Sequence, residues 1–261
     1  MTIILHELKQ NRLSLIIWTS GIGFLLAVCI LIFPDIKMES GGISNLFSSM
    51  GGFTAAFGMD KINFGTLTGF YAIECGNILG LGGALYASNS AISVLAKEEK
   101  DHTAEFLFTH PVRRIHIVTG KLVSVLIQTV LLNAVLFLLA VSCILFIGEP
   151  VPWKELSLLH SAYFLLQAEL AGICFGISAF LRRGSAGIGL GLAVMMYFLN
   201  LIVNLSDQWE FLKYITPFKY AEGTDIVTNL CLDLRLTLTG MALMAAGAAC
   251  GYVKYCRKDI F

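Results

Sequence analysis

The sequence predicts an all-α integral membrane protein with six transmembrane helices, an N-terminal interfacial helix and one short cytoplasmic helix. Three observations predict this fold class. Hydrophobic residues make up 56% of the 261 positions and charged residues only 14%, whereas a soluble domain carries charge at about a quarter of its positions. The mean hydropathy is +0.76. The apolar residues gather in runs of about 20, the length that a helix needs to cross a bilayer. We expect one membrane domain over residues 1–261.

The N-terminal segment predicts an interfacial helix followed by the first span. Residues 2–12 place Ile4, Leu5 and Leu8 on one helical face and the charged side chains elsewhere, a pattern typical of a helix that lies in the membrane interface. Residues 13–34 carry no charge and form the first span. This run is too long for a cleaved signal peptide, and no small-residue cleavage site follows it.

Five further runs are long and apolar enough to be spans. Glu74 interrupts the second span and Glu169 the fourth, while the third span is free of charge. The last run is short, but long polar side chains at its ends can reach the interface. The five runs are 71–96, 122–148, 156–181, 184–206 and 236–253.

The distribution of basic residues sets the expected orientation. With six spans, both termini lie on one side, and that side holds 12 of the 18 Lys and Arg residues. Cytoplasmic loops of membrane proteins carry an excess of Lys and Arg. We therefore expect both termini in the cytoplasm. The six basic residues on the outer side are Lys37, Lys61, Lys154, Lys213, Lys219 and Arg235.

Two outer segments are longer than a connection between spans needs to be. Residues 35–70 are rich in Gly and Ser and predict a loop with one short helix. Residues 207–233 hold aromatic side chains among polar ones, a composition that suits the lipid–water interface. We expect short re-entrant or surface-lying helices in this second segment.

The most regular motif lies in the cytoplasmic segment between the second and third spans. Asp101 or Thr103 can cap a new helix, and Pro111 ends it. The expected helix covers about residues 101–111. Its apolar side chains suit docking to another protein, and the alternative is a helix that lies on the lipid headgroups. These side chains are Phe106, Leu107 and Phe108.

The same segment resembles a known family. From Glu98 to Arg114 it reads Glu-Glu-x-x-x-Thr-x-Glu-Phe-Leu-x-x-x-Pro-Val-x-Arg, which is similar to the signature of ABC-2-type permeases. The resemblance is to the six-span bacterial permeases linked to antibiotic-peptide resistance, sodium extrusion and nitrous-oxide-reductase maturation. His102 stands where that family commonly has Gly, and Arg113 where it often has Ser. Further similarity lies in Glu7-Leu8-Lys9-x-Asn11-Arg12, Gly120-Lys121-Leu122, Arg182-Arg183 through Gly187-x-Gly189 to Phe198-Leu199-Asn200, and Ile215-Thr216-Pro217-Phe218-Lys219-Tyr220.

The resemblance implies the permease subunit of an ATP-driven ABC transporter in the bacterial cytoplasmic membrane. The family's usual direction is export, here of a peptide, drug, lipid-like or ionic substrate. The helix at 101–111 would be the coupling helix, which sits in a groove of the ATP-binding subunit. The residues to which the resemblance gives this coupling role are Thr103, Glu105, Phe106, Leu107, Pro111 and Arg114.

The expected partners follow from the same resemblance. This chain has no G-x-x-x-x-G-K-[ST] motif with which to hold phosphates. The ATPase is therefore a separate polypeptide that binds ATP and Mg²⁺, and we expect no cofactor on this chain. A second permease subunit, identical or different, and membrane lipid complete the assembly. The zero net charge gives no basic field for nucleic acid.

Carboxylates inside two spans are the second set of candidate residues. Glu169 lies near the middle of the fourth span, with Gln167 beside it, and Glu74 lies about one turn inside the second span. A charge in hydrocarbon is costly, so both should face the bundle interior or a wet cavity. They could contact a proton or a cation during transport, or make hydrogen bonds between helices. For Asn133 and Asn77 we expect the hydrogen bonds.

The remaining residue classes add little chemistry. The seven cysteines include no C-x-x-C pair and are expected to pack as small apolar residues. The histidines include no pair at metal-ligand spacing, so no metal site is predicted, and no nucleophile–base set suggests an enzyme. The alternative function is a proton- or sodium-coupled secondary transporter that uses Glu169 and Glu74. Four glycine pairs predict close helix packing: Gly76/Gly80, Gly172/Gly176, Gly187/Gly191 and Gly247/Gly251.

Overall fold

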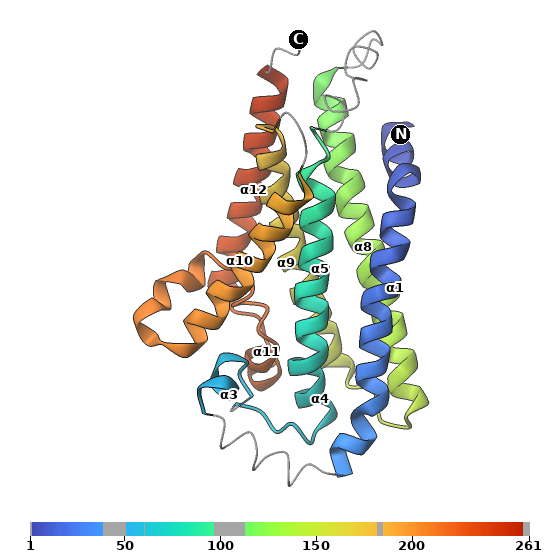
Figure 1. The fold of residues 1–261 in the computed structure, drawn as a ribbon, viewed down its shortest axis with the longest axis vertical. Coiled ribbons are helices and arrows are strands. Elements are labelled where there is room, and N and C mark those ends of the chain that lie inside the picture. Colours follow the sequence, from blue (N-terminus) through green and yellow to red (C-terminus); the bar gives the residue numbers. More distant parts are fainter. Residues whose placement is uncertain (1, 39–50, 60, 97–112, 182–184, 258–261) are drawn as a thin grey trace.

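The computed structural model describes residues 2–38, 51–59, 61–96, 113–181 and 185–257. Every secondary-structure element within these ranges is a helix, and the longest helices run along the long axis of the molecule (Figure 1). Five of them are long and apolar enough to cross a membrane, as a multi-pass membrane protein requires. They are α1 (Thr2–Met38), α8 (Arg114–Phe146), α9 (Trp153–Ser178), α10 (Ala186–Leu205) and α12 (Leu234–Arg257).

The segment predicted as the second span is helical but changes geometry twice. It is made of α4 (Leu67–Phe70), a π-helix (Tyr71–Cys75) and α5 (Gly76–Ile92), which follow one another without a gap. The longest of these, α5, has 17 residues. A π-helix adds a residue to one turn of an α-helix. The backbone is therefore helical from Leu67 to Ile92, although no single α-helix covers that length.

The N-terminal helix is longer than the sequence predicted. Residues 2–12 were expected to form a separate interfacial helix before the span at 13–34, but α1 continues through both and past Pro34. No Gly or Pro lies between residues 2 and 20, so nothing in this stretch interrupts the backbone hydrogen bonds. The placement of residues 2–12 in the membrane interface stays a prediction.

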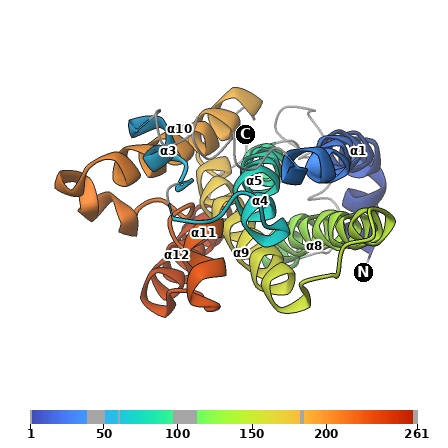
Figure 2. The same cartoon turned by 90° about the horizontal axis from the view of Figure 1, so that it is seen from below.

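The helix α9 is the centre of the bundle. It packs against α5, α8 and α12, while α1 pairs with α8 and α10 with α5. The view along the bundle shows α9 between α12 and α8 (Figure 2). Of the most apolar stretch of α9, 72% is buried inside the protein, against 33% or less for the other four long helices. The faces of those four helices that remain exposed are apolar, as contact with lipid requires.

Glycines bring α9 and α12 into backbone contact. A Cβ atom added at Gly176 would lie 2.5 Å from the carbonyl oxygen of Gly247, and one at Gly247 would lie 2.6 Å from that of Gly172. The predicted close packing is confirmed for this seam. A Cβ at Gly191 would meet nothing within 4 Å among the described residues, so that glycine makes no such contact.

The segment 207–233 turns back into the bundle. It contains a 3₁₀-helix (Asp207–Tyr214) and α11 (Gly223–Asn229), and α11 packs against α9 and the π-helix. Between these two helices, Phe218 and Tyr220 are buried in the main core. We call residues 207–233 the re-entrant segment because the chain returns to the core here. Whether its helices re-enter the membrane or lie on its surface stays a prediction. In the other long segment, α3 (Gly52–Ala56) is the short helix that the sequence led us to expect.

Candidate functional site

Most of the predicted coupling residues lie outside the described part of the chain. This holds for the helix predicted at 101–111 and for Thr103, Glu105, Phe106, Leu107 and Pro111, so their coupling role stays a prediction. The sixth residue, Arg114, is the first residue of α8. Its Nη1 atom donates a hydrogen bond of 3.5 Å to the carbonyl oxygen of Cys256, near the end of α12.

The chain on both sides of residues 97–112 is held by one buried ammonium group. Lys121 on α8 places Nζ 2.7 Å from Oε1 of Glu7 on α1, and it donates a hydrogen bond of 2.9 Å to the carbonyl oxygen of Val94. Val94 lies two residues beyond the end of α5. The Lys121 side chain is 1% exposed and that of Glu7 5%. We call Glu7, Val94 and Lys121 the Lys121 anchor.

A second contact ties the same turn to the central helix. The backbone N–H of Leu95 donates a hydrogen bond of 3.0 Å to Oγ of Ser178, the last residue of α9. Leu95 and Ser178 are both buried. Four helices, α1, α5, α8 and α9, are therefore joined by buried polar contacts at the point where the chain leaves for residues 97–112.

The ion pair of the Lys121 anchor was not predicted from the sequence. The resemblance pointed to both Glu7 and Lys121, but as parts of two separate motifs. The two residues are 114 positions apart, and no periodicity within one helix joins them. The available signal was that Glu7 stands before the first predicted span and Lys121 before the third, and that both spans are expected to start on the same side of the membrane.

Glu169 is buried and hydrogen-bonded. Its Oε2 atom accepts a hydrogen bond of 2.9 Å from the hydroxyl of Tyr220, and the residue is 2% exposed. Gly240 on α12 comes so close that an added Cβ would collide with the carboxyl group. The carboxyl group thus joins α9, α12 and the re-entrant segment. The hydrogen bond between elements is confirmed, and a role in transport stays a prediction.

Glu74 lies on the π-helix and is partly buried. Its carboxylate makes no hydrogen bond to the described residues, and no described contact joins it to Glu169. One turn along, the Asn77 amide donates to the carbonyl oxygen of Ile73 at 2.8 Å and accepts a hydrogen bond of 3.1 Å from the hydroxyl of Tyr197. The interhelical bond predicted for Asn77 is confirmed.

Asn133 makes the other predicted bond between helices. Its Nδ2 atom donates to Oε1 of Gln167 at 2.6 Å, and Gln167 in turn donates to the carbonyl oxygen of Leu79 at 3.4 Å. Gln167 is fully buried. These bonds connect α8, α9 and α5 in the interior of the bundle, and they satisfy amide groups that would otherwise be buried without partners.

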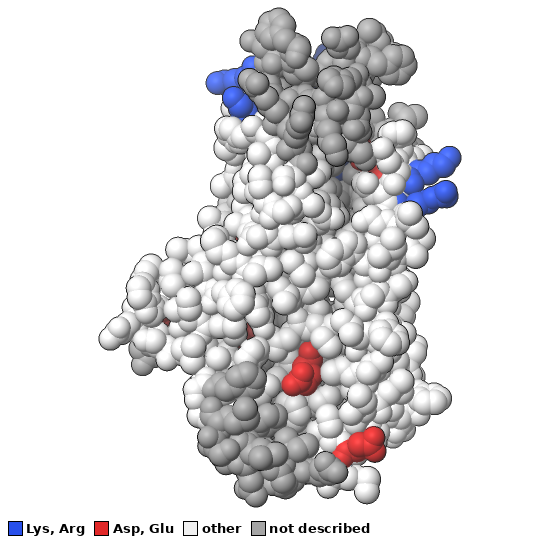
Figure 3. Space-filling model, in the orientation of Figure 1, with Lys and Arg blue, Asp and Glu red and all other residues white. Residues whose placement is uncertain are grey.

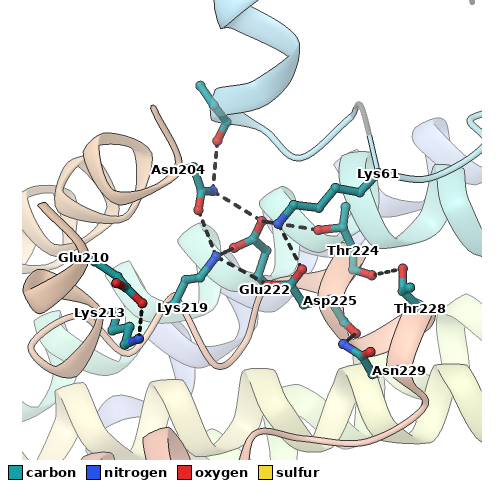
Figure 4. Close-up of polar contacts among 11 residues, drawn as sticks. Lys61, Asn204, Glu210, Lys213, Lys219, Glu222, Thr224, Asp225, Thr228 and Asn229 are labelled. Carbon is teal, nitrogen blue, oxygen red and sulfur yellow. Dashed lines mark hydrogen bonds and ion pairs between the residues drawn. The ribbon is translucent and has the colours of Figure 1, made fainter. Parts of the chain in front are cut away.

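At the end of the bundle away from the Lys121 anchor, four charged residues form a cluster (Figure 4). Lys219 Nζ lies 2.5 Å from Glu222 Oε2 and 3.4 Å from Asp225 Oδ2. Lys61 Nζ lies 3.0 Å from Asp225 Oδ1 and 3.4 Å from Glu222 Oε1. Asn204 on α10 accepts a hydrogen bond of 3.0 Å from Lys219. We call Lys61, Lys219, Glu222 and Asp225 the four-charge cluster.

The four-charge cluster alternates cations and anions, and this shifts two pKa values. Burial by itself lowers the pKa of Lys61, but the charges of Glu222 and Asp225 raise it above its ordinary value. For Asp225 the signs are reversed: burial by itself raises the pKa, but the charges of Lys219 and Lys61 bring it below its ordinary value. Each shift favours the charged form. In the sequence, Lys61 and Lys219 counted toward the orientation and Lys219 toward the family resemblance. Nothing joined them to Glu222 and Asp225, because Lys61 is 161 and 164 positions from these two partners.

Within the described residues, no group of three or more His, Cys, Asp or Glu side chains is arranged to hold a metal ion. The described part of the chain also shows all seven cysteines as free thiols. The polar chemistry of the protein thus gathers at the two ends of the bundle and around a few buried amides and carboxylates between them.

The sequence was compared with known proteins. The model of the family described as ABC-2 family transporter protein matches residues 1–260. A search of curated proteins finds no match.

Proposed function

The chain belongs to the ABC-2 family of transporter proteins, and from this membership we propose that it is a six-span export permease driven through a coupling helix at 101–111. Members of this family are the membrane component of an ABC transporter. The chain is therefore a non-catalytic subunit, and a separate ABC ATPase hydrolyses ATP. Membership decides against the alternative of a secondary transporter.

The six-span topology rests on the continuous helical stretch from Leu67 to Ile92. At 26 residues in three successive helices, it has the length that a bilayer requires, and we take it as the second span. In support, α1 begins and α12 ends at the same end of the bundle (Figure 1), as an even number of spans demands.

We place both termini in the cytoplasm of a bacterial cell. On the face drawn in Figure 3, the visible Lys and Arg side chains lie toward the end that holds the termini. The excess of basic residues on cytoplasmic segments supports this orientation. Residues 207–233 and the four-charge cluster then face the outside.

The observation that carries the coupling proposal is the Lys121 anchor with its neighbour, the bond from Leu95 to Ser178. A push on residues 97–112 reaches α1, α5, α8 and α9 through buried polar contacts. Packed interiors transmit such displacements as rigid-body movements instead of absorbing them. ATP and Mg²⁺ on the ATPase would supply the push, and a second permease subunit would complete the assembly. The cargo would be a peptide, drug, lipid-like or ionic substrate.

The test changes two apolar residues of the proposed coupling helix. In the Phe106→Ala, Leu107→Ala variant we expect reduced copurification with the ATPase and loss of substrate-stimulated ATP hydrolysis, because burial of each side chain contributes about 1.5–3 kcal/mol. Export is measured separately, as the ATP-driven uptake of each candidate substrate into inside-out vesicles.

The matched control is Phe146→Ala. Phe146 is the last residue of α8, at the end of α8 that is far from the proposed coupling helix, and it is 82% exposed. The control should insert, bind the ATPase and hydrolyse ATP as the unaltered chain does. A double variant that binds the ATPase at full strength and transports normally would contradict the coupling proposal.

A further inference from the structure

Two cavities meet at the four-charge cluster. The inner cavity, of about 50 Å³, lies between α5, α9, α10 and residues 218–224. The outer cavity, of about 650 Å³, lies between the end of α10, the re-entrant segment and the start of α12. The polar side chains that line the inner cavity are Asn77, Tyr163, Asn200, Asn204, Glu222 and Thr224.

The inner cavity contains two buried polar atoms that lack a hydrogen-bond partner among the described residues. They are the hydroxyl of Tyr163 and Oδ1 of Asn200, on residues that are 2% and 7% exposed. Buried polar groups in proteins are almost always satisfied, by protein or by ordered water. A water molecule needs about 10–15 Å³ and two to four polar partners, and this cavity offers both. Water in this cavity can accept a hydrogen bond from the Tyr163 hydroxyl and donate one to Oδ1 of Asn200.

The four-charge cluster separates the two cavities. Asn204 lines both of them, Glu222 lines the inner cavity, and Lys61, Lys219 and Asp225 line the outer one. The exposed fraction of the side chains falls from the outer cavity toward the inner one. It is 41% at Lys61, 38% at Asp225, 18% at Lys219 and 7% at Glu222. Figure 4 shows these side chains pointing toward one another from different parts of the chain. The cluster therefore forms a polar wall between the two cavities, with Lys61 and Asp225 on its more exposed side and Glu222 on its buried side.

We propose that the inner cavity is a water-binding site, and that the four-charge cluster is a barrier whose separation opens this site to the outer cavity and to small hydrophilic solutes. The two cavities then form a polar passage inside one protomer. Describing this passage as the outer part of an export path depends on the proposed function. The site and its barrier do not.

A wall of ion pairs suits an opening barrier. The two cations and two anions leave no net charge, so the wall neither attracts nor repels one sign of solute. When the pairs separate, water from either cavity can hydrate the released groups, and partly exposed pairs also weaken as salt screens them. The contrasting outcome is a purely structural cluster that never opens and only joins Lys61 to the re-entrant segment.

The experiment measures how fast a charged, membrane-impermeant methanethiosulfonate reagent modifies Asn200→Cys from outside. The full chain is used with its ATPase, with all seven native cysteines replaced. In the intact cluster we expect slow modification. Adding Lys219→Gln should speed it by at least roughly tenfold, because Lys219–Glu222 is the largely buried pair of the cluster, with side chains 18% and 7% exposed. Removing one partner of such a pair destabilises the pairing by more than a factor of ten in its equilibrium constant.

Three controls define the result. Lys213→Gln makes the same chemical change in an exposed pair with Glu210 and should leave the rate unchanged. Met195→Cys, on the exposed apolar face of the same helix, should stay unmodified in every background. A chain that keeps only native Cys231, which is exposed and lines the outer cavity, should react fast throughout.

A second measurement needs no cluster variant. Raising the ionic strength should speed modification of Asn200→Cys in the intact cluster and leave Cys231 unaffected. The barrier is disproved if the thiol at position 200 stays unmodified both in Lys219→Gln and at high salt, or if it reacts as fast as Cys231 from the start. Because labelling needs neither substrate nor ATP, failure of the export assay would not alter this outcome.

Discussion

The Lys121 anchor and the four-charge cluster are two charge networks at opposite ends of one helical bundle, and they are built differently. The anchor has one cation, is almost fully buried and joins the long helices α1 and α8 to the turn after α5. The cluster has two cations and two anions, is partly exposed and joins loops to the end of α10. An almost fully buried pair can hardly separate, because each released charge would stay out of water. The alternating cluster can separate, because water reaches it.

The largest effect is expected at the anchor. Lys121→Met leaves the Glu7 carboxylate buried without its cation, and we expect it to lower the free energy of unfolding by about 3–5 kcal/mol. Unfolding of the purified protein, followed by tryptophan fluorescence in denaturant, measures the loss. The matched control is Lys37→Met, which removes an exposed ion pair with Glu149 and should cost less than about 1 kcal/mol.

Adding Glu7→Gln to Lys121→Met separates charge from packing. If the loss comes from the unpaired carboxylate, the double variant recovers part of the stability of the single one. Equal losses in Lys121→Met and Lys37→Met would show that the two ends of the bundle do not differ in this way.

A smaller effect is expected in the four-charge cluster. Glu222→Gln removes a carboxylate that accepts hydrogen bonds from Lys219, Lys61 and Asn204, and should lower the free energy of unfolding by about 1.5–3 kcal/mol. This loss should shrink at high salt, because the pairs are partly exposed. The loss in Lys121→Met should not depend on salt. The same unfolding experiment at two ionic strengths decides the matter, and an equal salt dependence in both variants would contradict the comparison.

Acid should weaken the cluster by way of Asp225. The pKa of this carboxyl group is lowered in the folded protein, so its contribution to stability is full above the ordinary pKa of an aspartate and is lost as pH falls through the folded value. Asp225→Asn should therefore be less stable than the unaltered chain at neutral pH, and the difference should vanish in strong acid. Thermal unfolding as a function of pH tests this, and a constant difference across the range would refute it.

The smallest effect on stability is expected at Glu169, between the two regions. Glu169→Gln keeps an oxygen that can accept the hydrogen bond from Tyr220, so folding and assembly should be nearly unchanged. If the carboxyl group takes part in transport, turnover or its pH dependence should change. Wild-type transport at every pH tested would leave Glu169 with the structural role alone.

The sequence predicted the long helices well because a helix that crosses lipid needs about 20 mostly apolar residues in a row, and such runs are easily recognised. Uncharged apolar runs predicted α8, α10 and most of α1, and α9 was predicted in spite of the buried carboxyl group of Glu169. The changes of helix geometry were not predictable in this way. Residues 71–96 are apolar enough to be predicted as a span despite Glu74, whereas the helical stretch runs from Leu67 to Ile92, and nothing in the composition marks the π-helix at Tyr71–Cys75.

Contacts between distant residues were the main omission at the candidate sites. Asn77, Asn133 and the Gly172–Gly247 seam followed a local rule, since small or amide side chains within spans have few other roles. The pair of Glu7 and Lys121 depends on which helices are neighbours, and one sequence does not contain that information. The four-charge cluster further depends on the path of a re-entrant segment, which composition predicted only in outline.

The buried pair of the Lys121 anchor also bears on how the protein is made. Glu7 leaves the ribosome 114 residues before Lys121, which at the usual rate of synthesis is roughly 6–23 s. During that interval the Glu7 carboxylate has no partner and must stay in contact with water at the membrane surface. The N-terminal turns of α1 can take their final place only after the start of α8 has been synthesised, so the ion pair closes no earlier than the insertion of α8.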